Sequence, residues 1–218
     1  MTCLTLGRPL SIAPRYGTFS LTGVNEDMKQ VSFLMSKYAR SGVLAGRVDG
    51  DNARHKLLSQ LGAPDLPTIV VLDFSSVQLA TASFLDESVL KLREDLSDRP
   101  VYLIVSNLLP AVEEELDALL YRAQDAFLAM KCGPDGSFSN AHLLGSLDPK
   151  LKDAYERIKE KREASATELH SESRDSENIG PTAWNNRLNV LTSKGLLVEI
   201  PTGKSKKYKP LEEILNGA

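Results

Sequence analysis

The side chains best suited to recognition chemistry gather near the carboxyl end of the chain, in the segment 181–191. Leu188 and Leu191 share one face of a helix over this segment, so that face belongs to a core. The projecting positions carry a mostly polar set: Thr182, Trp184, Asn185, Asn186 and Arg187. Arginine and asparagine can each make two hydrogen bonds to a base edge, and a threonine hydroxyl at a helix start suits a phosphate. The pattern predicts a helix that contacts DNA.

Positive charge is concentrated a short distance after that helix. Four lysines lie between positions 204 and 209 and include Lys204, Lys206 and Lys207. Clustered cations can contact the phosphates of DNA. We therefore expect Lys204, Lys206 and Lys207 to contribute to DNA binding.

Three residues of the predicted helix have a structural alternative. Arg187 can brace the fold or reach only a phosphate, and Trp184, the single tryptophan, can serve as a partly buried staple. Asn186 can cap or brace the helix instead of reading a base. The sequence alone leaves these alternatives open.

Motifs of enzymes and metal sites are absent from the sequence. There is no glycine-rich phosphate loop or Gly-x-Ser-x-Gly elbow, and His55, His142 and His170 stand alone. Cys3 and Cys132 have neither a second cysteine nor a histidine at the spacing of a zinc site. We expect no enzymatic activity, no catalytic residue, no cofactor and no metal.

The two cysteines and the apolar runs bear on location. Two cysteines cannot build a disulfide framework, which favours a reducing cytosol. The longest apolar runs, within 68–74 and 101–112, are interrupted by polar residues and fall short of a membrane-spanning helix. No secretory signal is evident in the first 20 residues. We expect a soluble, cytoplasmic protein without a membrane partner.

The formal net charge of -3 divides unevenly along the chain. Residues 150–218 hold 13 Lys and Arg against 11 Asp and Glu, a net +2, whereas residues 1–149 sum to -5. A difference of this kind between two parts of a chain indicates different surfaces and different partners.

The elements that must position these residues follow from hydrophobic periodicity. We expect a hairpin over 11–21 with its turn at 14–16, then helices over 25–41 and 51–61. Residues 68–72 read as an inner strand, 83–96 as a helix with Ser83 as its N-cap, and 101–105 as a second buried strand. A helix from Pro110 and two short strands, 127–131 and 138–144, complete the set.

Strands that alternate with helices predict an α/β layered domain. Beyond Asp148 the sequence changes to a charged helix over 150–163, without a buried strand. We therefore divide the chain into an α/β domain over residues 1–147 and a smaller domain over 148–218.

The stretch from Val70 to Asp86 resembles the core of STAS domains, the fold of anti-sigma-factor antagonists. The closer likeness is to STAS-like domains of uncharacterised bacterial proteins, which read Leu-Asp-Phe-x-x-Val and then Ser-Phe-Leu-Asp-Glu. This chain has those patterns at 72–77 and 83–87, and the resemblance covers roughly residues 10–108. It implies a sheet-and-helix domain that serves regulation or binds protein partners, among them a kinase-like ATPase.

In antagonists of the partner-switch type a kinase phosphorylates the first serine of a serine pair. The resemblance places Thr81 and Ala82 where that family has Asp-Ser, and leaves Ser83 at the second serine. The usual acceptor is therefore missing, and the candidate phosphoacceptors are Ser83 and Thr81. A phosphate there would add close to two negative charges at a helix start.

The segments 164–169, 181–191 and 194–197 resemble the winged helix-turn-helix of bacterial regulators, over roughly residues 150–214. The resemblance implies a positioning helix at 164–169, a recognition helix at 181–191 and a wing over 198–211. One departure is the segment 170–180, which is longer, more polar and more acidic than the usual connection and reads as an extended positioning helix or a mobile loop.

The two resemblances together predict a bacterial transcription regulator that binds duplex DNA, with a STAS-like domain for regulation. Because such modules usually read paired half-sites, we expect a homodimer. The alternative is a protein-interaction adaptor of a partner-switch or multi-protein operon system, in which the winged helix mediates docking or dimerisation.

Overall fold

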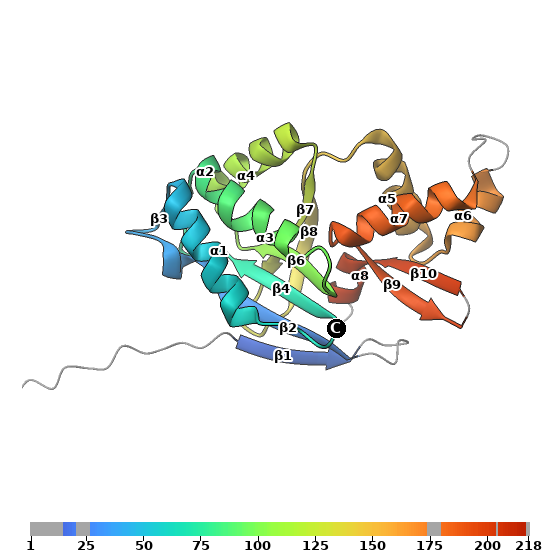
Figure 1. Cartoon of the computed structure of the whole chain (residues 1–218), viewed down its shortest axis with the longest axis horizontal. Helices are drawn as coiled ribbons and strands as arrows, with labels where there is room; N and C mark the ends of the chain where they lie inside the picture. Colours follow the sequence, from blue (N-terminus) through green and yellow to red (C-terminus); the bar gives the residue numbers. More distant parts are fainter. Residues whose placement is uncertain (1–14, 21–26, 174–179, 204, 217–218) are drawn as a thin grey trace, which may run out of the picture.

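The computed structural model describes residues 15–20, 27–173, 180–203 and 205–216. It is an α/β structure built around one six-stranded sheet (Figure 1). The strand order is β1-β2-β4-β6-β7-β8, with β2, β4, β6 and β7 parallel and the two edge strands antiparallel to their neighbours. The strands are β1 Arg15–Ser20, β2 Asp27–Leu34, β4 Thr68–Asp73, β6 Val101–Ser106, β7 Ala126–Cys132 and β8 Phe138–Gly145.

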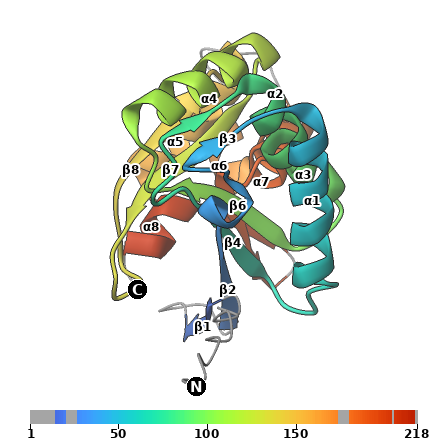
Figure 2. The same cartoon turned by 90° about the vertical axis from the view of Figure 1, so that its left-hand side faces the viewer.

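The helices that connect the parallel strands all cover the same face of the sheet. Each parallel strand lies beside the next one in sequence, and because such crossovers are right-handed, successive helices fall on one side. Figure 2 shows α1, α2, α3 and α4 together along that side. They are α1 Arg47–Leu61, α2 Ala82–Leu85, α3 Lys91–Asp95 and α4 Pro110–Ala123, with a π-helical turn over Asp86–Leu90 joining α2 to α3. A small ladder, β3 Val43–Leu44 with β5 Leu79–Ala80, lies outside the main sheet.

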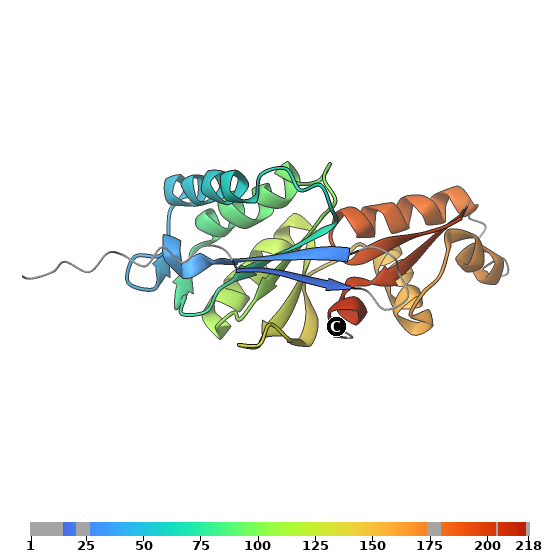
Figure 3. The same ribbon diagram turned by 90° about the horizontal axis from the view of Figure 1, so that it is seen from below.

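Because all the crossovers turn in the same direction, no crossover helix covers the other face of the sheet. The carboxy-terminal unit, residues 149–216, supplies cover for it, as the short red helix α8 below the blue strands in Figure 3 illustrates. Its elements are α5 Pro149–Lys161, α6 Ala166–Ser173, α7 Pro181–Ser193, β9 Leu197–Thr202, β10 Ser205–Pro210 and α8 Leu211–Asn216.

Two connected cores result, one on each face of the sheet. Val70 of β4 lies beside Leu103 of β6 in the core under the crossover helices. Val71 and Ile104, the next pair along, belong to the second core, which continues into the carboxy-terminal unit through residues such as Tyr155. The predicted inner strand at 68–72 is therefore buried on both faces, as expected.

The helix predicted over 25–41 is wrong: residues 27–34 form β2, and only Met35–Tyr38 turn as a short 3₁₀ helix. Met28 and Val31 share a helix face but point to opposite faces of a strand. Both are buried because both faces of this sheet are covered, Met28 in the second core and Val31 in the first. Because residues on both faces of β2 are buried, the spacing of its apolar residues resembles that of a helix.

The hairpin predicted at 11–21 is also different. Arg15 and Tyr16, assigned to its turn, lie in β1, and β1 pairs with β2. The predicted strand at 11–13 lies outside the described residues. The remaining expected elements up to α5 are present, with α1 starting at Arg47 and not at Asp51. Within the described ranges, no helix combines the length and the apolar character needed to cross a membrane.

Candidate functional site

Helix α7 presents one buried and one open face. Leu188 and Leu191 are fully buried at helical spacing, as predicted. Thr182, Asn185 and Asn186 are exposed in the first half of the helix, on the part that projects away from the sheet (Figure 1). The polar face of α7, which carries the candidate base-reading amides of Asn185 and Asn186, is therefore exposed.

Trp184 belongs to the buried face, so the expectation that it projects toward DNA is wrong. Its side chain has no exposed area, and the guanidinium carbon of Arg187 lies 4.8 Å from the ring centroid. Arg157 of α5 lies over the same ring at 5.5 Å. Trp184 precedes Leu188 and Leu191 at helical spacing. It therefore lies on the same apolar stripe, which places it in the core. Arg187 is half-buried in this stack.

The hairpin β9–β10 carries its lysines beside carboxylates. Lys206 Nζ lies 2.8 Å from Glu199 Oε1 on the neighbouring strand, and Lys207 Nζ lies 2.8 Å from Glu163 Oε1. The hydrogen bond from each lysine to its carboxylate raises the pKa of Lys206 and of Lys207. Both lysines are fully charged near neutral pH, but their charge is partly balanced within the chain. Lys204 lies outside the described residues.

The hairpin is attached to α7 and to the start of α6. The Tyr208 hydroxyl donates to Asn189 Oδ1 at 2.9 Å, and Tyr208 exchanges backbone hydrogen bonds with Ala164. Tyr208 itself is buried. Asn189, which the sequence patterns did not single out, therefore links α7 to the hairpin.

Helix α6 begins with a reciprocal capping arrangement. The Ser165 amide donates to Glu168 Oε2 at 2.6 Å, and the Glu168 amide donates to Ser165 Oγ at 3.2 Å. These bonds hold the pKa of Glu168 below its ordinary value. Leu169 is buried against the neighbouring helices. Of the acidic connection that follows, residues 174–179 lie outside the described residues.

Thr81, and not Ser83, caps the helix that follows β5. Thr81 Oγ1 accepts from the Phe84 amide at 3.4 Å and from the Gly46 amide at 3.3 Å. Ser83 is half-buried, with its hydroxyl 3.2 Å from that of Thr81. Glu115 Oε1 accepts from the Ala82 amide at 3.0 Å. A phosphate on either candidate acceptor would meet this carboxylate at the helix start.

The carboxyl end of α7 is held by an ionic cluster that no sequence pattern indicated. Asp125 pairs with both Lys194, directly after α7, and Arg93 of α3. All three side chains are mostly buried, and burial lowers the pKa of Arg93 to about 10 and also lowers the pKa of Lys194. Arg93 also donates to the Ala126 carbonyl at 2.7 Å. The cluster links the crossover helices to the candidate recognition helix.

Other ligand chemistry is not evident in the described part of the chain. Within it, no group of three or more histidine, cysteine, aspartate or glutamate side chains could hold a metal ion. A scan against protein-family models finds no match. A search of curated proteins likewise finds no relative.

Proposed function

We propose that the chain is a bacterial, cytoplasmic transcription regulator that binds duplex DNA through a winged helix-turn-helix formed by α5–α8. In this assignment α6 is the positioning helix, α7 the recognition helix and β9–β10 the wing. The observation that carries the proposal is the division of α7, whose apolar stripe is buried while Thr182, Asn185 and Asn186 stay exposed.

The amino-terminal half of α7 would enter the major groove, because a recognition helix places its first residues against base edges. Asn185 and Asn186 can bond adenine through two hydrogen bonds each, and Thr182 can contact a phosphate. Arg187 serves first as a brace on Trp184, and its guanidinium then has a phosphate as its partner in the complex. The wing lysines approach the flanking backbone.

The amino-terminal α/β unit supplies the regulatory part of the proposal. Its resemblance to STAS-like domains favours a surface for protein partners, such as a kinase-like ATPase. A homodimer would present two copies of α7 to paired half-sites. The ionic cluster at Asp125 supports coupling between the two units, because it joins α3 to the end of α7.

The test is a labelled-duplex shift with a random-sequence pool at two salt concentrations. An Asn185→Ala/Asn186→Ala variant should lose its preference among the sequences of the pool, whereas Asn52→Ala, an exposed position on α1, should select sequences like the wild type. Substituting Lys204, Lys206 and Lys207 by alanine should lower the salt slope by about 0.9 for each lysine that contacts a phosphate. Absence of binding at low salt would refute the proposal.

A second candidate is a protein-interaction adaptor in which the carboxy-terminal unit mediates docking or dimerisation. The pairing of Lys206 with Glu199 and of Lys207 with Glu163 favours it, because paired lysines attract phosphates less strongly. An adaptor should retain a kinase-like ATPase in a pull-down from its own host and should purify without nucleic acid. Copurifying DNA and a duplex shift would instead favour the regulator.

A further inference from the structure

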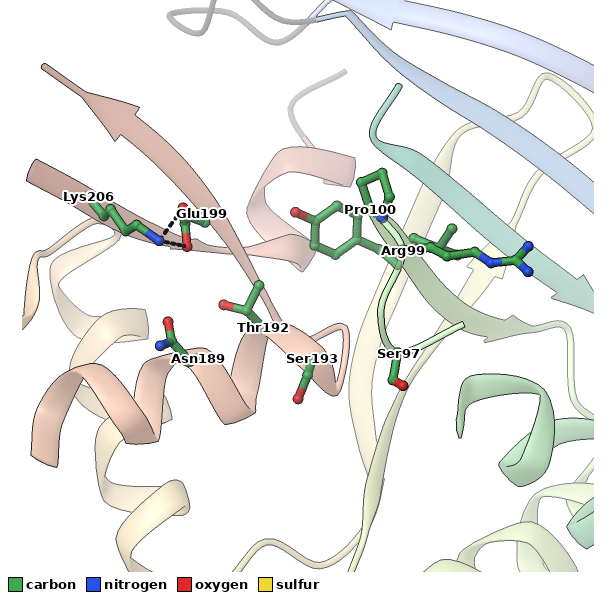
Figure 4. Close-up of a pocket in the computed structure, with 10 residues that line it drawn as sticks. Ser97, Arg99, Pro100, Asn189, Thr192, Ser193, Glu199 and Lys206 are labelled. Carbon is green, nitrogen blue, oxygen red and sulfur yellow. Dashed lines mark hydrogen bonds and ion pairs between the residues drawn. The ribbon is translucent and has the colours of Figure 1, made fainter. Parts of the chain in front are cut away.

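A pocket of about 360 Å³ lies where the two units of the chain meet (Figure 4). One wall is the connection from α3 to β6, which includes Ser97. The facing wall is the second half of α7, with Asn189, Thr192 and Ser193. The hairpin closes one end with Glu199 and Lys206. The volume lies at the lower end of the range for small-molecule sites.

The serine and threonine hydroxyls of this pocket each donate to a backbone carbonyl. Ser97 donates to the Glu94 carbonyl at 2.7 Å, Thr192 to the Leu188 carbonyl at 2.9 Å and Ser193 to the Val190 carbonyl at 2.9 Å. A hydroxyl has a single proton, so each of these oxygens keeps only acceptor capacity for a ligand. The two serines belong to opposite walls of the pocket.

The charged groups of the lining are one carboxylate, one ammonium and one guanidinium. Lys206 Nζ lies 2.8 Å from Oε1 and 2.9 Å from Oε2 of Glu199. The Lys206 side chain is nevertheless 56% exposed. The guanidinium of Arg99, the other cation of the lining, points away from Glu199 in Figure 4 and donates to the Gly62 carbonyl at 2.8 Å. Of the two cations in the lining, only the exposed Lys206 therefore competes with a ligand for Glu199.

We propose that this pocket binds a small ligand that carries an amine or a guanidinium group. The cationic end would pair with Glu199 in place of Lys206, and its N–H groups would donate to the oxygens of Ser97, Thr192 and Ser193. A donor-rich cation complements the pocket, because its walls offer several acceptors and a carboxylate. An anionic ligand would instead meet the negative charge of Glu199 and serine and threonine hydroxyls that already donate to backbone carbonyls.

Binding would also change the hairpin. A ligand on Glu199 displaces Lys206, which is then free to approach a DNA phosphate. The ligand would touch both α7 and the α3–β6 connection and so hold the recognition helix against the amino-terminal unit. This coupling to DNA rests on the proposed function, whereas the ligand site does not.

The ligand site is tested without DNA by titration calorimetry on the full chain. The probe is agmatine, which has a guanidinium at one end and an ammonium at the other; glutamate is the anionic comparison. Agmatine should bind saturably to the wild type, and Glu199→Gln should weaken it by about tenfold or more because a charge-assisted hydrogen bond is lost. Glu163→Gln is the matched control, since Glu163 pairs with a hairpin lysine and does not line the pocket.

A second variant tests the place of binding without altering the carboxylate. Ser97 is exposed on a loop, so Ser97→Trp should fold normally and fill the pocket, and it should also abolish agmatine binding. The ligand proposal is overturned by any of three results: no saturable binding, equal binding by Glu199→Gln and the wild type, or preference for glutamate.

The coupling is tested by repeating the duplex shift with agmatine at constant ionic strength. Agmatine should raise duplex affinity in the wild type and leave Glu199→Gln unchanged, because that variant lacks the ligand partner. Ligand binding without a change in duplex affinity would overturn the coupling alone. Absence of duplex binding under every condition would overturn the proposed function, and the calorimetric result on the pocket would stand separately.

Discussion

At the scale of single residues, Arg187 combines a packing role with a candidate binding role. Its guanidinium lies over the fully buried Trp184 ring, an arrangement that attracts a cation to the electron-rich face of the indole. A side chain braced in this way keeps one orientation in the free protein. Such preorganisation lowers the entropy cost of a later phosphate contact.

Arg187→Ala should therefore lower stability as well as duplex affinity. The free energy of unfolding should fall by about 0.5–1 kcal/mol, the usual magnitude of an accessible cation–π contact. Urea denaturation measures this change, and Arg122→Ala, on the exposed side of α4, is the control. A variant with unchanged stability and lost affinity would show that the contact with DNA is the sole role of Arg187.

The N-cap at Thr81 gives a second prediction for a single side chain. Thr81→Ala should lower the free energy of unfolding by about 1 kcal/mol, because the Phe84 and Gly46 amides lose the Thr81 hydroxyl as an acceptor. Thr81→Ser should retain most of the stability, and Ser83→Ala should have little effect. If Ser83→Ala proved the more destabilising change in urea denaturation, the cap would have to be reassigned to Ser83.

At the scale of elements, the position of α7 depends on one carboxylate. Asp125 pairs with both Lys194 and Arg93, two cations that are mostly withdrawn from water. Removal of one partner from a buried ionic cluster leaves uncompensated charge, which is strongly unfavourable. The carboxyl end of α7 is thus held by an interaction that tolerates little change.

Asp125→Ala should lower the free energy of unfolding by about 3–5 kcal/mol in urea denaturation. Asp65→Ala, at an exposed loop position, should leave the stability within about 0.5 kcal/mol of the wild type. A loss no larger than that of the Asp65 variant would mean that water or nearby acids replace the carboxylate, and that the cluster does not anchor α7.

The start of α6 should respond to acid. The backbone hydrogen bond from Ser165 holds the pKa of Glu168 below its ordinary value of 4.5. A carboxylate with a lowered folded pKa contributes stability that is complete above its unfolded pKa and is lost as the pH falls through the folded pKa. Urea denaturation from about pH 6 to pH 3 should therefore show a steeper loss for the wild type than for Glu168→Gln. Glu114→Gln, exposed on α4, should follow the wild type.

At the scale of the whole molecule, the sheet and the carboxy-terminal unit share a core. Ile69, Val71 and Ile104 on the sheet belong to one connected set with Trp184 and Leu188 on α7. The pattern of strand neighbours explains this, because crossovers of one hand leave that face without helices. The two predicted domains therefore share a hydrophobic boundary, and their division at residue 147 stays a prediction.

Removal of the carboxy-terminal unit should expose that face. A chain ending at residue 147 should bind the dye ANS and aggregate, because a contiguous apolar patch would face water. The full chain under the same conditions is the control. A truncated chain that unfolded cooperatively and bound no dye would indicate that the sheet can cover this face by itself.

Sequence patterns predicted the elements in which one signal dominates. The β-branched run of β4, the acid-rich start of α4 and the Gly-Pro-Asp-Gly turn between β7 and β8 each have a local cause and were located correctly. Residues 27–34 were misassigned because burial on both faces of β2 produced a spacing that also suits a helix. Trp184 was misplaced because it was counted with the projecting residues, although it lies on the same helical stripe as Leu188 and Leu191 and is buried with them.

The sequence by itself determined the α/β character, the positions of most helices and strands, and the polar face of α7, because these depend on residues close together in the chain. Only the tertiary structure decided which charges meet. Lys194 pairs with Asp125, which is 69 residues away in the sequence, and Lys207 pairs with Glu163, which is 44 residues away. Such pairings depend on where distant elements pack, and that packing follows from the one-sided winding of the sheet and the docking of the carboxy-terminal unit on its open face.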